Sequence, residues 1–408
     1  MDEHPPLGEG LGGALTPMLS TQIPAEFASI RPYADDELPA VLAELMADQQ
    51  FMQVASQIVP NLRDKLQAMA AHVQGGAPIN ALAIQKAFFY PLLEQLLAQC
   101  SKGLDMSVPD GMDCQQPYTF VSNHRDIVLD SAFLAKLLID NGFPTTVEIA
   151  IGDNLLIYPW IKKLVRVNKS FIVQRSLSMR EMLRASQLMS RYMHFAIAEK
   201  RENIWIAQRE GRAKDSNDRT QDSILKMMAM GGEGSVIERL QQLHITPLSI
   251  SYEYDPCDFL KAQEFQQKRD IAGFTKSRED DLTNMQTGIF GQKGRIHYHV
   301  APCIDQWLAT IDPATPKTEL FTLIAQHIDS QIHRHYQLFP SNYVAADLLR
   351  GTNHEGCYTD DDRKAFIEYL ESRIAKVRLP EPDHEFLRER ILTMYANPLI
   401  NQEIALAR

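Results

Sequence analysis

The sequence predicts an α/β protein with a mostly parallel central sheet flanked by helices and with helical N- and C-terminal additions. In the middle of the chain, short β-branched apolar runs alternate with helical patterns, as in sheets built from crossover connections. On either side, apolar residues recur at spacings of three and four, which is typical of amphipathic helices. We therefore expect a flexible arm over 1–24, a helical region over 25–105, an α/β domain over 106–310 and a helical region over 311–408.

The elements of the α/β domain follow from these patterns. Strands are expected at 118–122, 145–151, 169–174, 203–207, 246–252 and 295–301. Helices between them are expected at 126–139, 155–165, 178–200, 223–230 and 235–243. The Gly-, Asp- and Pro-rich segment 101–116 is predicted to be a connecting loop.

The two flanking regions show helical patterns without strand patterns. In the N-terminal region the patterns cover 37–46, 51–59, 61–73 and 79–99, and in the C-terminal region they run from about 316 to the end. Breaks in the second series are expected at Pro340, over 351–358 and around Pro380.

Bulk properties narrow the class of function. The formal net charge of −11 argues against a general nucleic-acid binder. No run approaches eighteen apolar residues, so no spanning helix is expected, and the first residues lack the basic and apolar stretches of a signal peptide. Five widely spaced cysteines without a CxxC pair indicate reduced thiols in a cytoplasm, with neither a disulfide framework nor a zinc site.

The stretch around His124 joins a predicted strand to a predicted helix. Functional side chains of open α/β sheets gather at such junctions. A neutral imidazole can remove a proton from a hydroxyl when a carboxylate fixes its tautomer. Asp126 and Asp130 are both candidates for that carboxylate, and Asp126 could instead stabilise the helix N-terminus. A helix-capping cluster without catalysis is an equally good interpretation of this stretch taken alone.

Cationic side chains follow two further predicted strands. Arg175 ends the run Phe-Ile-Val-Gln, and a guanidinium there suits bidentate phosphate binding, although a surface ion pair is the simpler interpretation. After strand 203–207, the segment 208–219 contains four cations, and Gly211 permits a tight turn that can present N–H groups to an anion. A solvated loop with paired charges remains the alternative.

These segments, in this order, resemble the glycerol-phosphate and lysophosphatidate acyltransferase family. The matching blocks are His124 with a following aspartate, the Phe-Ile run ending in Arg175, the Glu210–Gly211–Arg212 block, and the proline-containing strand 246–250. The family separates its His and Asp by four residues, whereas this chain has five before Asp130 and one before Asp126. The resemblance covers about residues 115–255.

The resemblance implies an O-acyltransferase that moves a fatty acyl group from acyl-CoA or acyl-carrier protein to glycerol 3-phosphate or 1-acylglycerol 3-phosphate. His124 would act as general base, oriented by Asp130 or Asp126. Arg175, Arg212 and Lys214 would hold the acceptor's phosphate, with Glu210 and Gly211 completing the binding site. The acyl thioester is a co-substrate, and the expected reaction needs no cofactor or metal.

Other interpretations remain open beside this one. The acceptor could be a non-phosphate, amino-acid-containing lipid, or the chain could be a catalytically silent lipid-binding protein of the same fold. His297 and His299 would face the same side of a strand, as metal ligands sometimes do, but the sequence offers no neighbouring ligand to complete a set. Because the substrates are lipids, we expect a cytoplasmic protein that docks peripherally at the inner face of the cell membrane, and no nucleic-acid partner.

Overall fold

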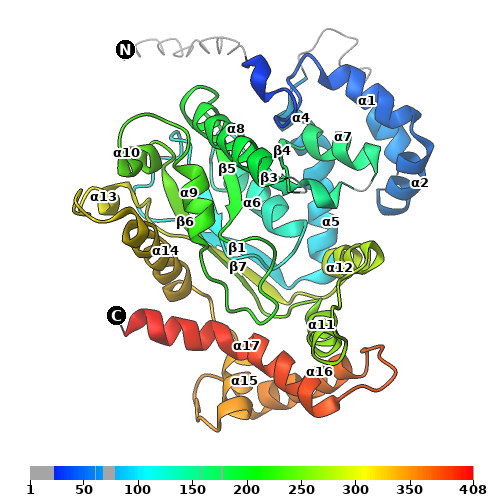
Figure 1. Ribbon diagram of the computed structural model, residues 1–408. Helices are drawn as coiled ribbons and strands as arrows, with labels where there is room; N and C mark the ends of the chain where they lie inside the picture. Colours follow the sequence, from blue (N-terminus) through cyan, green and yellow to red (C-terminus); the bar gives the residue numbers. More distant parts are fainter. Residues whose placement is uncertain (1–22, 60, 68–78, 157, 176–177, 408) are drawn as a thin grey trace, which may run out of the picture.

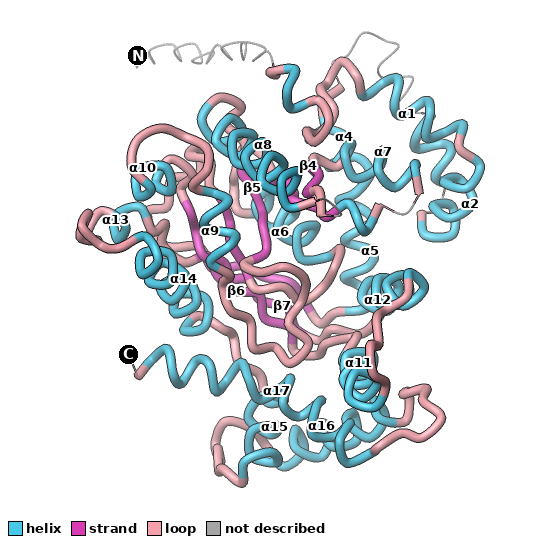
Figure 2. The backbone as a smooth tube through the Cα atoms, viewed as in Figure 1, coloured by secondary structure: helices cyan, strands magenta, loops and turns pink. Residues whose placement is uncertain are grey.

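A seven-stranded sheet forms the centre of the molecule (Figures 1 and 2). The computed structural model describes residues 23–59, 61–67, 79–156, 158–175 and 178–407. The strands are β1 (Gly103–Ser107), β2 (Thr119–Ser122), β3 (Val147–Gly152), β4 (Ser170–Val173), β5 (Asn203–Ala207), β6 (Ile245–Tyr252) and β7 (Arg295–Val300), in the spatial order β1-β7-β6-β2-β5-β3-β4. The five strands from β6 to β4 in this order are mutually parallel.

The predicted fold class and all six predicted strands are confirmed, with one strand missed. The segment 101–116 was expected to be a loop but contains β1, which pairs in parallel with β7 at the sheet edge. Its sequence, Gly-Leu-Asp-Met-Ser, has no β-branched residue and none of its side chains is fully buried, so it lacks the usual strand pattern. β7 runs antiparallel to β6, so the parallel arrangement ends there.

Side chains alternate across the sheet, and helices cover both faces. Val121 and Ile204 contribute to one core with α8 (Met179–Ala198), α9 (Asp222–Met228), α10 (Val236–Gln241) and α14 (Lys317–Arg334). Phe120 and Trp205 point to the opposite core, which α5 (Tyr90–Cys100) and α6 (Leu129–Asp140) complete. This period-two burial is what a sheet covered on both faces requires.

The N-terminal helices form a separate apolar cluster beside α7 (Pro159–Val167). They are α1 (Leu38–Ala47), α2 (Gln49–Ile58) and the α4 (Ala81–Ile84) to α5 segment, which passes through a π-helical stretch at Gln85–Phe89. The helices expected at 37–46, 51–59 and 79–99 are thereby confirmed. The expected arm and part of the helix over 61–73 lie outside the described residues.

The C-terminal helices lie below the sheet in the view of Figure 1. They are α15 (Pro340–Arg350), α16 (Asp360–Ile374) and α17 (His384–Leu406), with the short α13 (Asp305–Leu308) and α14 before them. They pack with α11 (Asp258–Asp270), which together with α12 (Arg278–Phe290) is inserted between β6 and β7. α14 belongs by sequence to the 311–408 region but packs onto the sheet.

Candidate active site

The predicted site residues lie at one edge of the sheet because the strands that carry them are parallel. His124 follows β2, Arg175 follows β4 and Glu210 follows β5. The carboxyl ends of parallel strands meet at a single edge, where open α/β sheets bind their ligands. The topology therefore brings together residues that are far apart in the sequence.

The His124 imidazole contacts Asp130. Its Nδ1 lies 2.8 Å from Asp130 Oδ2, and the same oxygen accepts hydrogen bonds from the backbone N–H groups of Arg125 at 2.6 Å and Asp126 at 3.0 Å. The Tyr252 hydroxyl donates to Asp130 Oδ1 at 3.1 Å. The Asp130 side chain is fully buried and lies in the first turn of α6, where the helix dipole stabilises a negative charge.

Asp126 has a different role in this geometry. Its Oδ1 accepts hydrogen bonds from the backbone N–H groups of Val128 at 2.9 Å and Leu129 at 2.8 Å, at the start of α6. Burial raises the pKa of the Asp126 carboxyl, and the neighbouring Asp130 charge raises it further. The structure thus places Asp130 against the imidazole and Asp126 against the helix N-terminus.

The start of α6 explains how Asp130 reaches His124. A helix had been expected from residue 126, but α6 begins at Leu129, so residues 123–128 form a non-helical loop. The loop reverses direction, so the Asp130 carboxylate in the first turn of α6 contacts the His124 imidazole. The five residues between His124 and Asp130 are therefore compatible with direct contact.

Neighbouring strands fix the orientation of the His124 loop. The Asn123 amide donates to Ile250 O at 2.9 Å and accepts from Ile250 N at 2.8 Å, which ties the end of β2 to β6. The Trp205 ring contacts the His124 ring edge-on, with centroids 5.5 Å apart, and its Nε1 donates to Ser122 Oγ. Only 13% of the His124 side chain is exposed, so most of the ring is enclosed by these neighbours.

The predicted phosphate-binding residues divide into two groups. Arg175 Nη1 lies 3.3 Å from Glu210 Oε1, and both side chains are partly open to solvent, at 35% and 68% exposure. Gly211, at φ +67, provides the left-handed turn expected of it. Arg175 and Glu210, from separate strand ends, are therefore brought together.

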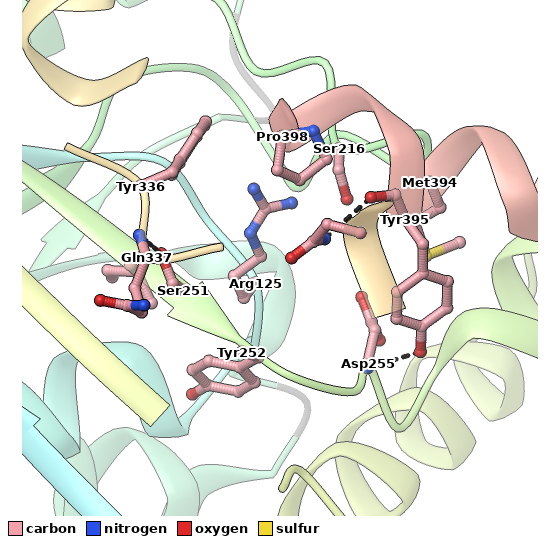
Figure 3. Close-up of a pocket in the computed structure, with 12 residues that line it drawn as sticks. Arg125, Ser216, Ser251, Tyr252, Asp255, Tyr336, Gln337, Met394, Tyr395 and Pro398 are labelled. Atoms are coloured by element: carbon pink, nitrogen blue, oxygen red, sulfur yellow. Dashed lines mark hydrogen bonds between the residues drawn. The ribbon is translucent and has the colours of Figure 1, made fainter. Parts of the chain in front are cut away.

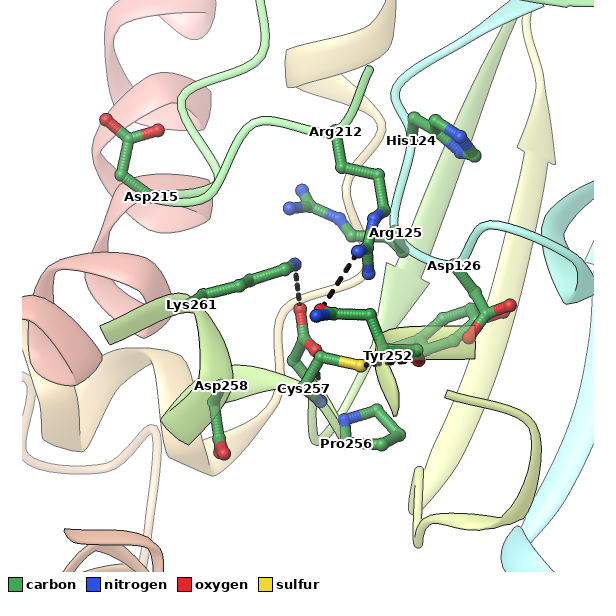
Figure 4. A network of polar contacts seen from close by, with 12 residues as sticks. His124, Arg125, Asp126, Arg212, Asp215, Tyr252, Pro256, Cys257, Asp258 and Lys261 are labelled. Carbon is green, nitrogen blue, oxygen red and sulfur yellow. Dashed lines mark hydrogen bonds and ion pairs between the residues drawn. The ribbon is translucent and has the colours of Figure 1, made fainter. Parts of the chain in front are cut away.

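Arg212 and Lys214 are engaged with other parts of the protein. The Arg212 guanidinium donates to Asn284 Oδ1 of α12 at 3.2 Å, and in Figure 4 it extends toward the loop that carries Arg125 and Asp126. Lys214 pairs with Glu264 of α11 at 2.7 Å, and burial lowers the pKa of its ammonium group. Both side chains thus join the loop after β5 to the inserted helices.

Arg125 is a buried cation that the sequence did not single out. Its guanidinium lies 3.5 Å from Asp218 and contacts the Tyr336 ring, with Nη1 left without a hydrogen bond among the described residues. It lines a cavity of about 30 Å³, together with Tyr252, Tyr336 and residues of α15 and α17 (Figure 3). That space can hold ordered water but is too small for a lipid headgroup. In the sequence, the one signal for Arg125 as a site residue is its position directly after His124.

The histidines on β7 have partners that the sequence did not reveal. His297 Nδ1 contacts Asp105 of β1 at 2.7 Å, and the His299 ring stacks on His335 with centroids 4.1 Å apart. Within the part of the chain that the structure describes, one His/Cys/Asp group has the spacing of metal ligands: His244, Cys303 and Asp305. It lies at the amino end of β6, away from His124.

Comparison with known proteins gives one family match for the segment that contains this site. Residues 102–251 match the family model Acyltransferase, a segment that runs from β1 to the end of β6 and contains His124, Asp130, Arg175 and Glu210. This segment of the chain is similar to an acyltransferase domain. No curated protein matches the sequence.

A solved structure also matches, at low similarity. It is the 1-acyl-sn-glycerophosphate (LPA) acyltransferase PlsC from Thermotoga maritima, with 10% sequence identity and a TM-score of 0.33, over 72% of this chain and 95% of that chain.

Proposed function

We propose that the protein transfers a fatty acyl group from an acyl thioester, acyl-CoA or acyl-carrier protein, to a hydroxyl of glycerol 3-phosphate or 1-acylglycerol 3-phosphate. The observation that carries the proposal is the His124–Asp130 pair, at 2.8 Å, inside the segment that matches the Acyltransferase family model. A carboxylate on Nδ1 favours the tautomer in which Nε2 is free to accept a proton.

The chemistry requires few groups. His124 Nε2 removes the proton from the acceptor hydroxyl as its oxygen attacks the thioester carbonyl, which forms a C–O bond. The tetrahedral intermediate then collapses, the C–S bond breaks, and the proton held by the imidazole passes to the departing thiolate. The products are an ester and a free thiol, and the sequence of steps needs no cofactor or metal.

Arg175 is the proposed phosphate-binding residue in this account. It lies at the same sheet edge as His124, is partly exposed, and has Glu210 as its carboxylate partner. A phosphate can replace that carboxylate, because a guanidinium binds both groups with two parallel N–H donors. Binding there would hold the acceptor's hydroxyl near the general base.

A first experiment tests the phosphate assignment. Arg175→Ala should raise the KM for glycerol 3-phosphate about tenfold or more, because a charge-assisted hydrogen bond is lost. Arg191→Ala is the matched control, since Arg191 is also a partly exposed arginine paired with a glutamate, Glu26, at 2.8 Å. Steady-state kinetics by thiol release measures both. An unchanged acceptor KM in Arg175→Ala would contradict the phosphate assignment.

A second candidate acceptor is a lipid without the phosphate, such as an amino-acid-containing lipid. The engagement of Lys214 with Glu264 favours it, because one expected phosphate ligand is already paired. A screen of acceptors with the purified protein, reading thiol release from acyl-CoA, separates the two. Absence of thiol release with every acceptor and thioester would favour a silent lipid-binding protein.

We also propose that the enzyme works from the cytoplasm at the inner face of the cell membrane. Within the described parts of the chain, no helix is both long enough and apolar enough to cross a bilayer. The enzyme would then bind its lipid acceptors while docked on the surface of the membrane.

A further inference from the structure

The first two turns of α8 carry a cluster of exposed apolar side chains. Met179, Met182 and Leu183 are 88%, 48% and 51% exposed. They occupy spacings of three and four residues, so they lie on one side of the helix. Apart from Ile404 and Leu406 at the end of α17, the other exposed large apolar side chains of the described residues lie on separate elements.

This apolar side continues the side of α8 that packs on the sheet. Met182 precedes the buried Met189 by seven residues and the buried Met193 by eleven, spacings that align the three side chains along the helix. Toward its C-terminal end, α8 is covered by the core that includes β2 and β5. Its first two turns extend beyond that core, and residues 178–184 are all exposed.

Cationic side chains accompany this apolar surface. Arg180 and Arg184 are exposed and form no ion pair with any described residue. The one acidic residue between them, Glu181, accepts hydrogen bonds from the Ser178 N–H at 3.0 Å and from its hydroxyl at 2.6 Å, so its charge serves the helix cap. The two arginines outnumber the one carboxylate, so the surface has a small net positive charge in a protein whose net charge is −11.

The position of the surface links it to the candidate active site. α8 follows β4, and Arg175 lies three residues before the N-cap Ser178. The ion pair between Arg175 and Glu210 holds the start of this connection to the loop after β5. A surface held by the first turns of α8 is thus adjacent in the chain to the proposed acceptor-binding residue.

We propose that the first two turns of α8, with Met179, Met182, Leu183, Arg180 and Arg184, form a docking surface for an anionic phospholipid membrane. Apolar side chains flanked by arginines are what binds a helix into the headgroup region of such a membrane. The inference deepens the proposed function, because docking here would bring lipid acceptors to the sheet edge that carries His124 and Arg175.

Vesicle co-sedimentation tests this surface on the full-length protein. The wild type should pellet with phosphatidylcholine vesicles that contain phosphatidylglycerol. The double variant Met179→Asp/Leu183→Asp should bind at least about ten times more weakly, because two side chains that would leave water become charged. Arg180→Gln/Arg184→Gln should lose the preference for phosphatidylglycerol over phosphatidylcholine alone, and with it the salt dependence.

The control variant is Leu323→Asp on α14, which replaces a side chain that is 41% exposed on another element. It should bind vesicles as the wild type does. Equal binding by wild type and Met179→Asp/Leu183→Asp would contradict the proposal, as would an equal loss in Leu323→Asp. A wild type that is dimeric in analytical ultracentrifugation, does not bind vesicles, and becomes monomeric in the α8 double variant would show that a second copy of this chain covers the surface.

An assay with water-soluble substrates keeps this inference separate from the proposed function. With glycerol 3-phosphate and a short-chain acyl-CoA, the α8 variants should release thiol at the wild-type rate. A wild type that is inactive in that assay but binds anionic vesicles through α8 would contradict the proposed reaction and leave the docking surface established.

Discussion

Asp126 and Asp130 have different hydrogen-bond partners because α6 begins between them, at Leu129. Asp126 precedes the helix and accepts from its first free N–H groups, whereas Asp130 lies in the first turn and faces back toward His124. Two backbone N–H groups and the Tyr252 hydroxyl hold the Asp130 carboxylate in place. The imidazole therefore meets a carboxylate whose orientation is already fixed.

A pair of matched variants distinguishes the two aspartates. Asp130→Asn should lower kcat by roughly 10³, because an amide no longer fixes the tautomer that frees Nε2. Asp126→Asn should keep kcat within a few fold, because its amide oxygen can still cap α6 and a buried charge near Asp130 is removed. Steady-state thiol release, with circular dichroism to verify folding, measures both. Equal losses in the two variants would contradict the division of roles.

The sequence predicted that a neighbouring aspartate orients His124, but it could not decide between Asp126 and Asp130. The choice depends on whether the helix starts at residue 126 or at Leu129, and a single sequence locates helix ends only within a few residues. Arg125 and Tyr252 were not predicted as site residues either. Their roles depend on the ends of β2 and β6 lying side by side, which is a property of the tertiary structure.

At the scale of elements, the insertion between β6 and β7 closes the site from one side. α12 approaches the His124 loop so closely that a Cβ built on Gly288 would clash with Asp126 Oδ2. The Arg212 guanidinium joins the same helix to the loop after β5 through Asn284. α12 therefore contacts two of the strand-end loops that form the candidate site.

Gly288→Ala tests this close packing. In an exposed helix, Gly→Ala would stabilise by about 1 kcal/mol. In Gly288→Ala we expect the free energy of unfolding to fall by about 1–3 kcal/mol, because the added methyl group displaces α12 or the buried Asp126 side chain. Gln286→Ala, at an exposed position of α12, is the control and should be neutral or slightly stabilising. Urea unfolding measures both free energies, and a stabilised Gly288→Ala would contradict the packing.

The sequence predicted the alternating strands and helices because each has its own periodicity, but it did not reveal the insertion. α11 and α12 are polar, and both follow β6 at a point where the chain reverses toward β7 without a parallel crossover. β1 was not predicted because its own sequence has no strand pattern. It is a short edge strand that forms by pairing with β7. Both depend on contacts between distant segments.

Across the whole molecule, the C-terminal helices, which lie below the sheet in Figure 1, bury several histidines. His333 Nδ1 on α14 accepts a hydrogen bond from Arg219 Nη1 at 3.0 Å, and the His327 ring stacks on Trp307 with centroids 3.7 Å apart. Burial lowers the pKa of His299, His327 and His333 to about 4 in each case. All three are therefore neutral in the folded protein near neutral pH.

These lowered pKa values predict acid-dependent loss of stability. Between about pH 6.5 and 4 the histidines bind protons in the unfolded chain but not in the folded protein. The free energy of unfolding therefore falls as the pH is lowered through this range, and the contribution of the neutral histidines to stability is complete above it. His327→Phe keeps a flat ring against Trp307 and removes one such group, so its stability should depend less steeply on pH. Urea unfolding across pH 4 to 7 measures the slopes, and identical slopes would contradict the assignment for His327.

The proposed general base of acyl transfer is His124, held by Asp130. The most direct measurement is the rate of thiol release from acyl-CoA by wild type and His124→Ala with saturating acceptor. We expect the wild type to release thiol in an acceptor-dependent manner and His124→Ala to be slower by roughly 10²–10⁴ while remaining folded. A folded His124→Ala that releases thiol at the wild-type rate would contradict this role of His124.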